Sequence, residues 1–135
     1  MGRWLLAYVV AGALFIAGDI CWISLTGPVI YRPVLGPLLA EKVNLGAGAA
    51  FYLVYFIGVV AFGVAPGLRS RSWLRSLGWG ALFGLVAYAT YDLTNQATLR
   101  TWSTTITLCD MGWGALISGL AAAAGCRAAM MLRQP

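Results

Sequence analysis

Three aspartates, Asp19, Asp92 and Asp110, have the clearest chemical potential in this sequence, because each lies in a long stretch without other charges. Each is the single charged residue within a run of 24 to 28 residues that is bounded by basic residues. A carboxylate in hydrocarbon is costly, and such groups face the interior of a bundle or a water-filled cavity, where they mark ion and proton paths. We therefore expect all three carboxyl groups to face inward and to form the functional site.

Aromatic and polar residues accompany these aspartates. Trp22 and Trp113 follow Asp19 and Asp110 by three residues, so that two D-x-x-W motifs occur. We predict a ligand-binding pocket that opens outward, with Asp19 and Asp110 at its floor. The predicted residues are Asp19, Trp22, Tyr88, Tyr91, Asp92, Asn95, Asp110 and Trp113, with Asp92 at the rim and with Arg32 or Arg100 as counter-charge. The alternative is that the aspartates only hold neighbouring helices together.

No cofactor or metal motif is evident. The sequence has no histidine, and Cys21, Cys109 and Cys126 show no metal-ligand spacing, which favours small buried hydrophobes. A divalent metal would have to be held by oxygen ligands such as Asp92 and Asn95. The nature of any metal or catalytic group is therefore left open by the sequence.

Four apolar runs must position these residues. The chain is 61% hydrophobic and 10% charged, where a soluble domain would carry about 25% charged residues. Because about 20 apolar residues cross a bilayer core, we predict an all-α membrane protein of one domain, 1–135, with four transmembrane helices in an antiparallel bundle. The expected spans are 4–26, 46–66, 76–94 and 104–126. The first run is longer than the core of a signal peptide, so we interpret it as a retained helix.

The basic residues predict the orientation. With four spans, six arginines and no acid fall on the side of the termini, and fewer basic residues fall on the other. The first side carries Arg3, Arg69, Arg71, Arg75, Arg127 and Arg133, and the second carries Arg32, Lys42, Arg100 and Glu41. The positive-inside rule places both termini in the cytoplasm. The net charge of +5 forms no basic stripe, so we exclude nucleic acid as a partner.

The connecting segments and the small residues allow further predictions. Pro66-Gly67 is expected to end the second helix. The proline-containing segment 27–45 is expected to lie at the outer interface or to dip in as a lid, with short helical turns, or else to be a plain loop. Small residues four apart, such as Gly80 and Gly84, favour close packing inside the bundle over dimerisation.

A run from Tyr91 to Trp102, YDLTNQATLRTW, followed by Asp110, Trp113 and Gly114, carries a family resemblance. It resembles the signature of a family of small bacterial membrane proteins known as domain of unknown function 2177. The first D-x-x-W motif and Phe51-Tyr52 also resemble that pattern. The resemblance covers nearly the whole chain and implies a four-helix protein of the bacterial cytoplasmic (inner) membrane, with no established reaction.

Three classes of function follow. The first is binding or transport of a cation, a proton or a small amphipathic molecule, and transport by so short a chain predicts a homodimer. The second is an enzyme that acts on a lipid or isoprenoid at the outer leaflet, although the sequence contains no nucleophile elbow, histidine box or D-D-x-x-D motif. The third is an accessory subunit of a membrane complex. We favour the first class, with membrane lipids as the expected surroundings.

Overall fold

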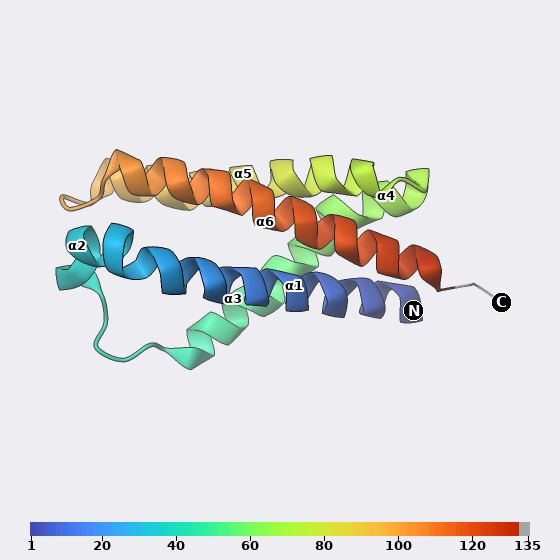
Figure 1. Ribbon diagram of the computed structural model, residues 1–135, viewed down its shortest axis with the longest axis horizontal. Coiled ribbons are helices and arrows are strands. Elements are labelled where there is room, and N and C mark those ends of the chain that lie inside the picture. The colour runs from blue at the N-terminus through green and yellow to red at the C-terminus, as the bar shows by residue number, and fades with distance from the viewer. Residues whose placement is uncertain (133–135) are drawn as a thin grey trace.

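The computed structural model describes residues 1–132, and all regular secondary structure in that range is helical (Figure 1). The first segment comprises α1 (Gly2–Thr26), the π-helical turn η1 (Gly27–Tyr31), α2 (Arg32–Leu35) and the 3-10 turn η2 (Gly36–Leu38). The second comprises α3 (Leu45–Gly58), the π-helical segment η3 (Val59–Val64) and α4 (Ala65–Ser70). Two long helices follow, α5 (Trp73–Thr98) and α6 (Thr104–Met131).

The later helices begin where short polar side chains cap their first turn. Asn44, Ser72 and Ser103 precede α3, α5 and α6, and their side-chain oxygens accept hydrogen bonds from backbone N–H groups in the first turn of each helix. Such caps satisfy N–H groups that have no partner within the helix. The chain therefore carries its own start signals for three of the four long segments.

The four segments form an antiparallel bundle, as predicted. Residues 2–38, 45–70 and 104–131 are helices long and apolar enough to cross a membrane. Helix α5 is more polar, but it runs antiparallel beside α6, and this pair makes the most extensive contact in the molecule (Figure 1). Helix α5 is similar in length to α6, which is long and apolar enough to cross a membrane.

Small residues let α5 approach α6 closely. A Cβ atom placed on Gly80 would lie 2.7 Å from the carbonyl oxygen of Ser118, and one on Gly84 would overlap the carbonyl oxygen of Gly114. Gly63 of η3 also lies tightly against Gly80. The predicted role of these glycines in internal packing is therefore confirmed.

The second helix does not end at Pro66-Gly67, so that prediction was wrong. Pro66 lies in the first turn of α4, directly after the π-helical segment, where a missing N–H is tolerated. The helix ends at Ser70, and Arg71 directly after it adopts a left-handed conformation with φ 52°. Gly67 serves a different purpose, because the side chain of Ser76 packs against it where the chain turns back.

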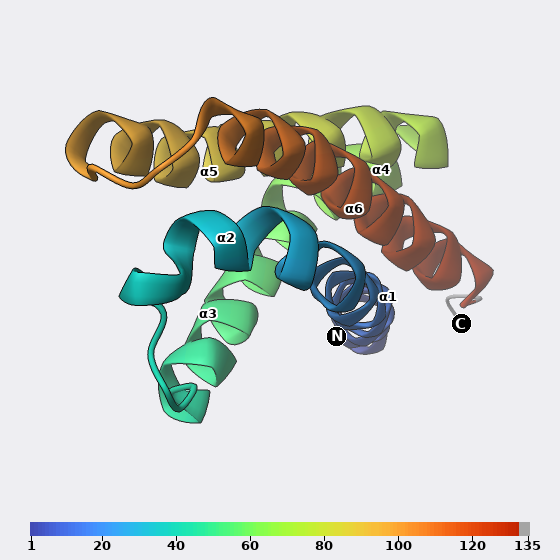
Figure 2. The same ribbon diagram turned by 60° about the vertical axis from the view of Figure 1, so that its left-hand side comes forward.

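The segment 27–45 contains the expected helical turns, but it is joined to α1 without a break. Prolines at positions 28, 33 and 37 fall at the start of η1, α2 and η2, where each helical type changes. The chain bends away from the axis of α1 through these turns (Figure 2). Only residues 39–44 are non-helical before α3 begins.

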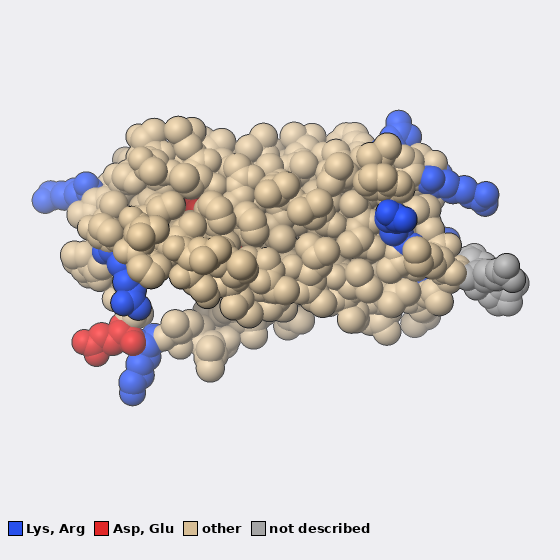
Figure 3. All heavy atoms as spheres, viewed as in Figure 1, with Lys and Arg blue, Asp and Glu red and all other residues tan. Residues whose placement is uncertain are grey.

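The two ends of the bundle differ in charge. The end that holds the start of α1, the turn at 71–72 and the last turns of α6 is called here the terminal end, and the opposite one the distal end (Figure 1). Arg3, Arg69, Arg71, Arg75 and Arg127 belong to the terminal end, and Arg133 lies outside the described residues. In the face shown in Figure 3, the basic side chains gather at the two ends, and the surface between them is uncharged apart from one small acidic spot.

The bundle is packed differently toward its two ends. Toward the terminal end, α1, η3 and α6 enclose an apolar core that includes Ala7, Ala11, Val64 and Ala122. Toward the distal end, α3 slants away from α5 and α6 (Figure 2). The polar residues described next lie in this distal half and at the boundary with the apolar core.

Candidate functional site

Asp92 and Asp110 form a pair of carboxyl groups at the contact between α5 and α6. Asp92 has no exposed surface, and Asp110 is 9% exposed. Their carboxyl groups are neighbours across this contact. Neither oxygen of Asp92 receives a hydrogen bond from any donor in the described residues. Burial of a charge without a partner is costly, so this pair requires a compensating species.

Tyr31 covers the pair from the distal side. Its hydroxyl donates a hydrogen bond to Asp110 and accepts one of 2.9 Å from the indole nitrogen of Trp22. The π-helical turn η1 ends at Tyr31, so this turn sets the direction in which the side chain projects. The sequence analysis did not include Tyr31 in the site. The sequence feature that could have indicated it is a tyrosine placed between the prolines of the connecting segment.

The two D-x-x-W motifs meet through their tryptophans. The rings of Trp22 and Trp113 are stacked, with centroids 4.7 Å apart and an angle of 7° between the planes. Because α1 and α6 run in opposite directions, Asp110 lies about one turn to the distal side of this stack and Asp19 about one turn to the terminal side. The tryptophans therefore separate the third aspartate from the carboxyl pair.

Asp19 has its own partner. The hydroxyl of Tyr52 in α3 donates a 2.7 Å hydrogen bond to Asp19, which is 9% exposed. Beyond it, the hydroxyls of Tyr55 and Ser118 are 2.8 Å apart in a buried contact. Tyr52 was quoted from the sequence only as part of the family pattern, and its position about two helical turns into α3 gave no sign that it would meet α1.

A chain of polar side chains leads from the distal end toward the carboxyl pair. Gln96, one turn beyond Asp92, donates to Thr104 at 3.0 Å and accepts from Thr107 at 2.7 Å. Thr107 also accepts a 3.0 Å hydrogen bond from the indole of Trp102. Thr104 is exposed and Thr107 is 2% exposed, so these groups extend from the surface to within about one helical turn of the buried pair.

The structure places the remaining predicted residues unequally. Tyr88 lies inside, where its ring packs on Gly114 and meets Tyr55 edge to face. Asn95 is half-buried, whereas Tyr91 is 61% exposed and packs on Trp102 at the surface. Arg32 and Arg100 are both exposed. In the described residues the hydrogen-bond partner of Asp110 is thus Tyr31 rather than an arginine.

One feature of the predicted site is corrected. Asp92 was expected at the rim near water, but it is the aspartate with no exposed surface, because the glycines of α5 and α6 bring the two helices together around it. The outward-opening pocket at the aspartates stays a prediction. The prediction that all three aspartates face the bundle interior is confirmed by their burial.

Comparison with known proteins identifies the class of this chain. Residues 4–127 match the model of the family described as "Predicted membrane protein (DUF2177)". The chain therefore belongs to this family, as the run beginning at Tyr91 indicated. No curated protein and no solved structure matches it.

Proposed function

We propose that this membrane protein binds a proton at the Asp92–Asp110 pair and exchanges it with the distal face. The observation that carries the proposal is the burial of Asp92 with both oxygens lacking a donor. Two facing carboxylates in an apolar interior repel each other, and a proton between them removes one charge and supplies the missing hydrogen bond. The family assignment supports the membrane setting of this chemistry and assigns no reaction to it.

A proton suits the site better than a larger cation. Asp92 has no exposed surface and Asp110 is 9% exposed, so a larger ligand would have to displace packed side chains. Within residues 1–132, no group of three acidic, cysteine or histidine side chains lies close enough together to hold a metal ion. Asp19 is bonded to Tyr52 on the far side of the tryptophan stack, which explains why the three aspartates do not act as one cluster.

The route of exchange is proposed to run through the polar chain at the distal end. Thr104, Gln96 and Thr107 supply hydroxyl and amide groups that can relay a proton from the surface. Toward the terminal end the path meets the Trp22–Trp113 stack and then the apolar core. The geometry therefore supports binding and release on one side rather than a continuous channel.

The orientation completes the proposal. The terminal end carries five arginines among its described residues, whereas the distal end carries Arg32, Lys42, Arg100 and Glu41. Applied to this topology, the positive-inside rule puts the terminal end in the cytoplasm. In a bacterial inner membrane, the carboxyl pair would then exchange protons with the periplasmic side.

Infrared spectroscopy of the protein in lipid membranes tests the proposal directly. A carboxyl group that holds a proton at neutral pH gives a C=O stretch separate from the carboxylate bands. We expect this band in the wild-type protein and its loss in both Asp92→Asn and Asp110→Asn. Glu41→Gln, which alters an exposed acid outside the bundle, serves as the control and should leave the band unchanged.

The opposite results would overturn the proposal. A wild-type spectrum without a protonated carboxyl at neutral pH would mean that the pair holds no proton. A band that survives both substitutions would belong to another group. Retention of native helix content, measured by circular dichroism, separates either outcome from failure to fold.

A further inference from the structure

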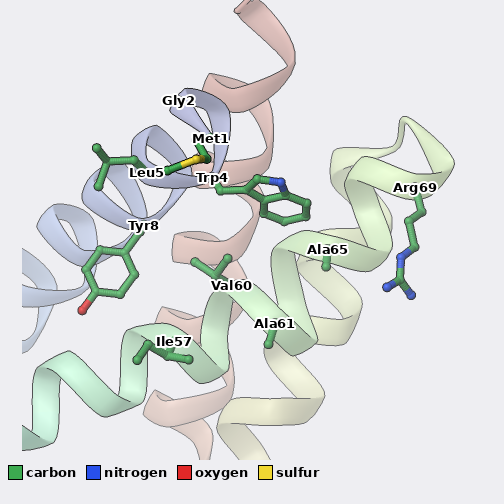
Figure 4. Close-up of a pocket in the computed structure, with 10 residues that line it drawn as sticks. All are labelled: Met1, Gly2, Trp4, Leu5, Tyr8, Ile57, Val60, Ala61, Ala65 and Arg69. Carbon is green, nitrogen blue, oxygen red and sulfur yellow. The ribbon is translucent and has the colours of Figure 1, made fainter.

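A groove runs along α1 and begins at the terminal end of the bundle (Figure 4). Its larger part has a volume of about 740 Å³ and lies between the first turns of α1 and the segment η3–α4. A second part of about 410 Å³ continues between α1 and α3. Both parts are lined by Tyr8, so they adjoin there. The groove is thus an elongated depression beside α1 rather than an isolated pocket.

The length and lining of the groove suit a hydrocarbon chain. The lining residues on α1 extend from Met1 to Ile16, which corresponds to roughly 22 Å along a helix. On the side of the groove that faces α1, Ala61 and Ala65 have small side chains that leave space. Trp4 projects between the helices (Figure 4). The hydroxyl of Tyr8 already donates to the carbonyl oxygen of Leu53, so it presents no unsatisfied donor to an occupant.

The mouth of the groove is basic. Arg69 lines it at the terminal end, and its side chain is exposed. The guanidinium of the nearby Arg3 lies over the ring of Trp4, 5.4 Å from its centroid, and does not line the groove. Arg69 is therefore the basic residue of the lining. No acidic residue lies at this end among the described residues, so an anionic headgroup would meet no repulsion there.

We propose that this groove is a binding site for an anionic phospholipid of the leaflet at the terminal end. The phosphate-bearing headgroup contacts Arg69, and one acyl chain lies along α1 past Trp4 and Tyr8. The groove is separate from the Asp92–Asp110 pair, so this proposal and the proton-binding proposal stand or fall independently. It also gives the membrane lipids expected from the sequence a defined place on the molecule.

Native mass spectrometry with defined lipids tests the site. The full-length protein is released in mild detergent and mixed with phosphatidylglycerol or phosphatidylethanolamine of identical acyl chains. We expect one phosphatidylglycerol molecule to be retained about fivefold better than phosphatidylethanolamine, the effect of one basic residue near an anionic lipid. Arg69→Gln should remove this preference, whereas Arg75→Gln, an exposed arginine at the same end that does not line the groove, should keep it.

A second pair of variants tests the path of the acyl chain. Ala61→Trp fills the groove and should abolish retention of both lipids, while Ala50→Trp, at an exposed position of α3 that does not line it, should not. Equal retention of the two lipids by the wild-type protein, or equal effects of Arg69→Gln and Arg75→Gln, would overturn the proposal. A lipid-free dimer that Ala61→Trp converts to a monomer would also overturn it, because a second copy of the chain would then fill the groove.

Discussion

At the scale of single residues, the burial of Asp92 is the feature that demands an explanation. Asp19 and Asp110 each accept a hydrogen bond from a tyrosine, but Asp92 accepts none in the described structure. An acid that only tied helices together would be expected to have such a donor. The contrast between Asp19 and Asp92 therefore separates a structural carboxyl group from one that binds a proton under our proposal.

Substitution of Asp92 by asparagine should stabilise the protein at alkaline pH. The amide introduced at this position can donate to Asp110, and a hydrogen bond to a charged acceptor is worth about 1.5–3 kcal/mol. The wild-type pair must lose its shared proton as the pH rises, whereas the amide keeps its hydrogens. Thermal unfolding in detergent should show a difference that grows with pH. Equal or lower stability of the variant at every pH would contradict the shared-proton geometry.

Removal of the Tyr31 hydroxyl should make the segment 27–44 less firmly held over the Asp92–Asp110 pair. Tyr31→Phe leaves Asp110 without its donor and Trp22 without its acceptor, at an expected cost of about 1–3 kcal/mol. We expect faster amide hydrogen exchange in residues 27–44 and a lower unfolding temperature. Tyr91→Phe is the matched control, because Tyr91 is largely exposed. If both variants behave alike, the Tyr31 bond does not hold this segment in place.

At the scale of elements, the close contact of α5 and α6 determines how the carboxyl pair is formed. Gly80 and Gly84 bring the backbone of α5 against the backbone of α6, and Gly114 packs against the ring of Tyr88. The carboxyl pair lies farther along the same helix contact, toward the distal end. The π-helical turn η1 acts at the other side by bringing Tyr31 over Asp110. The site is therefore a product of helix packing and not of a flexible loop.

Gly84→Ala should separate the two helices. The new Cβ would overlap the carbonyl oxygen of Gly114, and overpacking of this kind costs about 1–3 kcal/mol or more. Gly78→Ala is the matched control on the same helix, because a Cβ there meets nothing within 4 Å. Its higher helix propensity should leave stability unchanged or raise it by up to ~1 kcal/mol. Denaturation in mixed micelles compares the two, and equal behaviour would show that the contact at Gly84 is not tight.

At the scale of the whole molecule, the buried acidic residues and the arginine-rich surface lie toward opposite ends of the bundle. The distal half holds the buried aspartates and the polar chain, while the terminal end holds five of the arginines and the mouth of the groove. Under the proposed orientation, protons are exchanged on one side of the membrane and lipid is bound in the leaflet of the other. The groove and the carboxyl pair consequently do not compete for the same space.

Cysteine labelling in intact cells should reveal this orientation. In a variant with Cys21, Cys109 and Cys126 replaced, a thiol introduced by Glu41→Cys should react with a membrane-impermeant reagent added from outside. A thiol introduced by Arg75→Cys should react only after the cells are opened. The reverse pattern would place the termini outside and would overturn the proposed direction of exchange.

The sequence by itself determined the number of long helical segments, their apolar character, the charge difference between the two ends and the inward direction of the aspartates. These properties could be predicted because hydropathy and charge are local along the chain. Only the tertiary structure decided that Asp92 pairs with Asp110, that Trp22 stacks on Trp113 and that Tyr31 and Tyr52 supply the donors. Tyr31 and Asp110 are 79 residues apart, and their contact depends on helix register, crossing and the bend at η1. Those quantities arise from packing between segments and leave no signal at either residue alone.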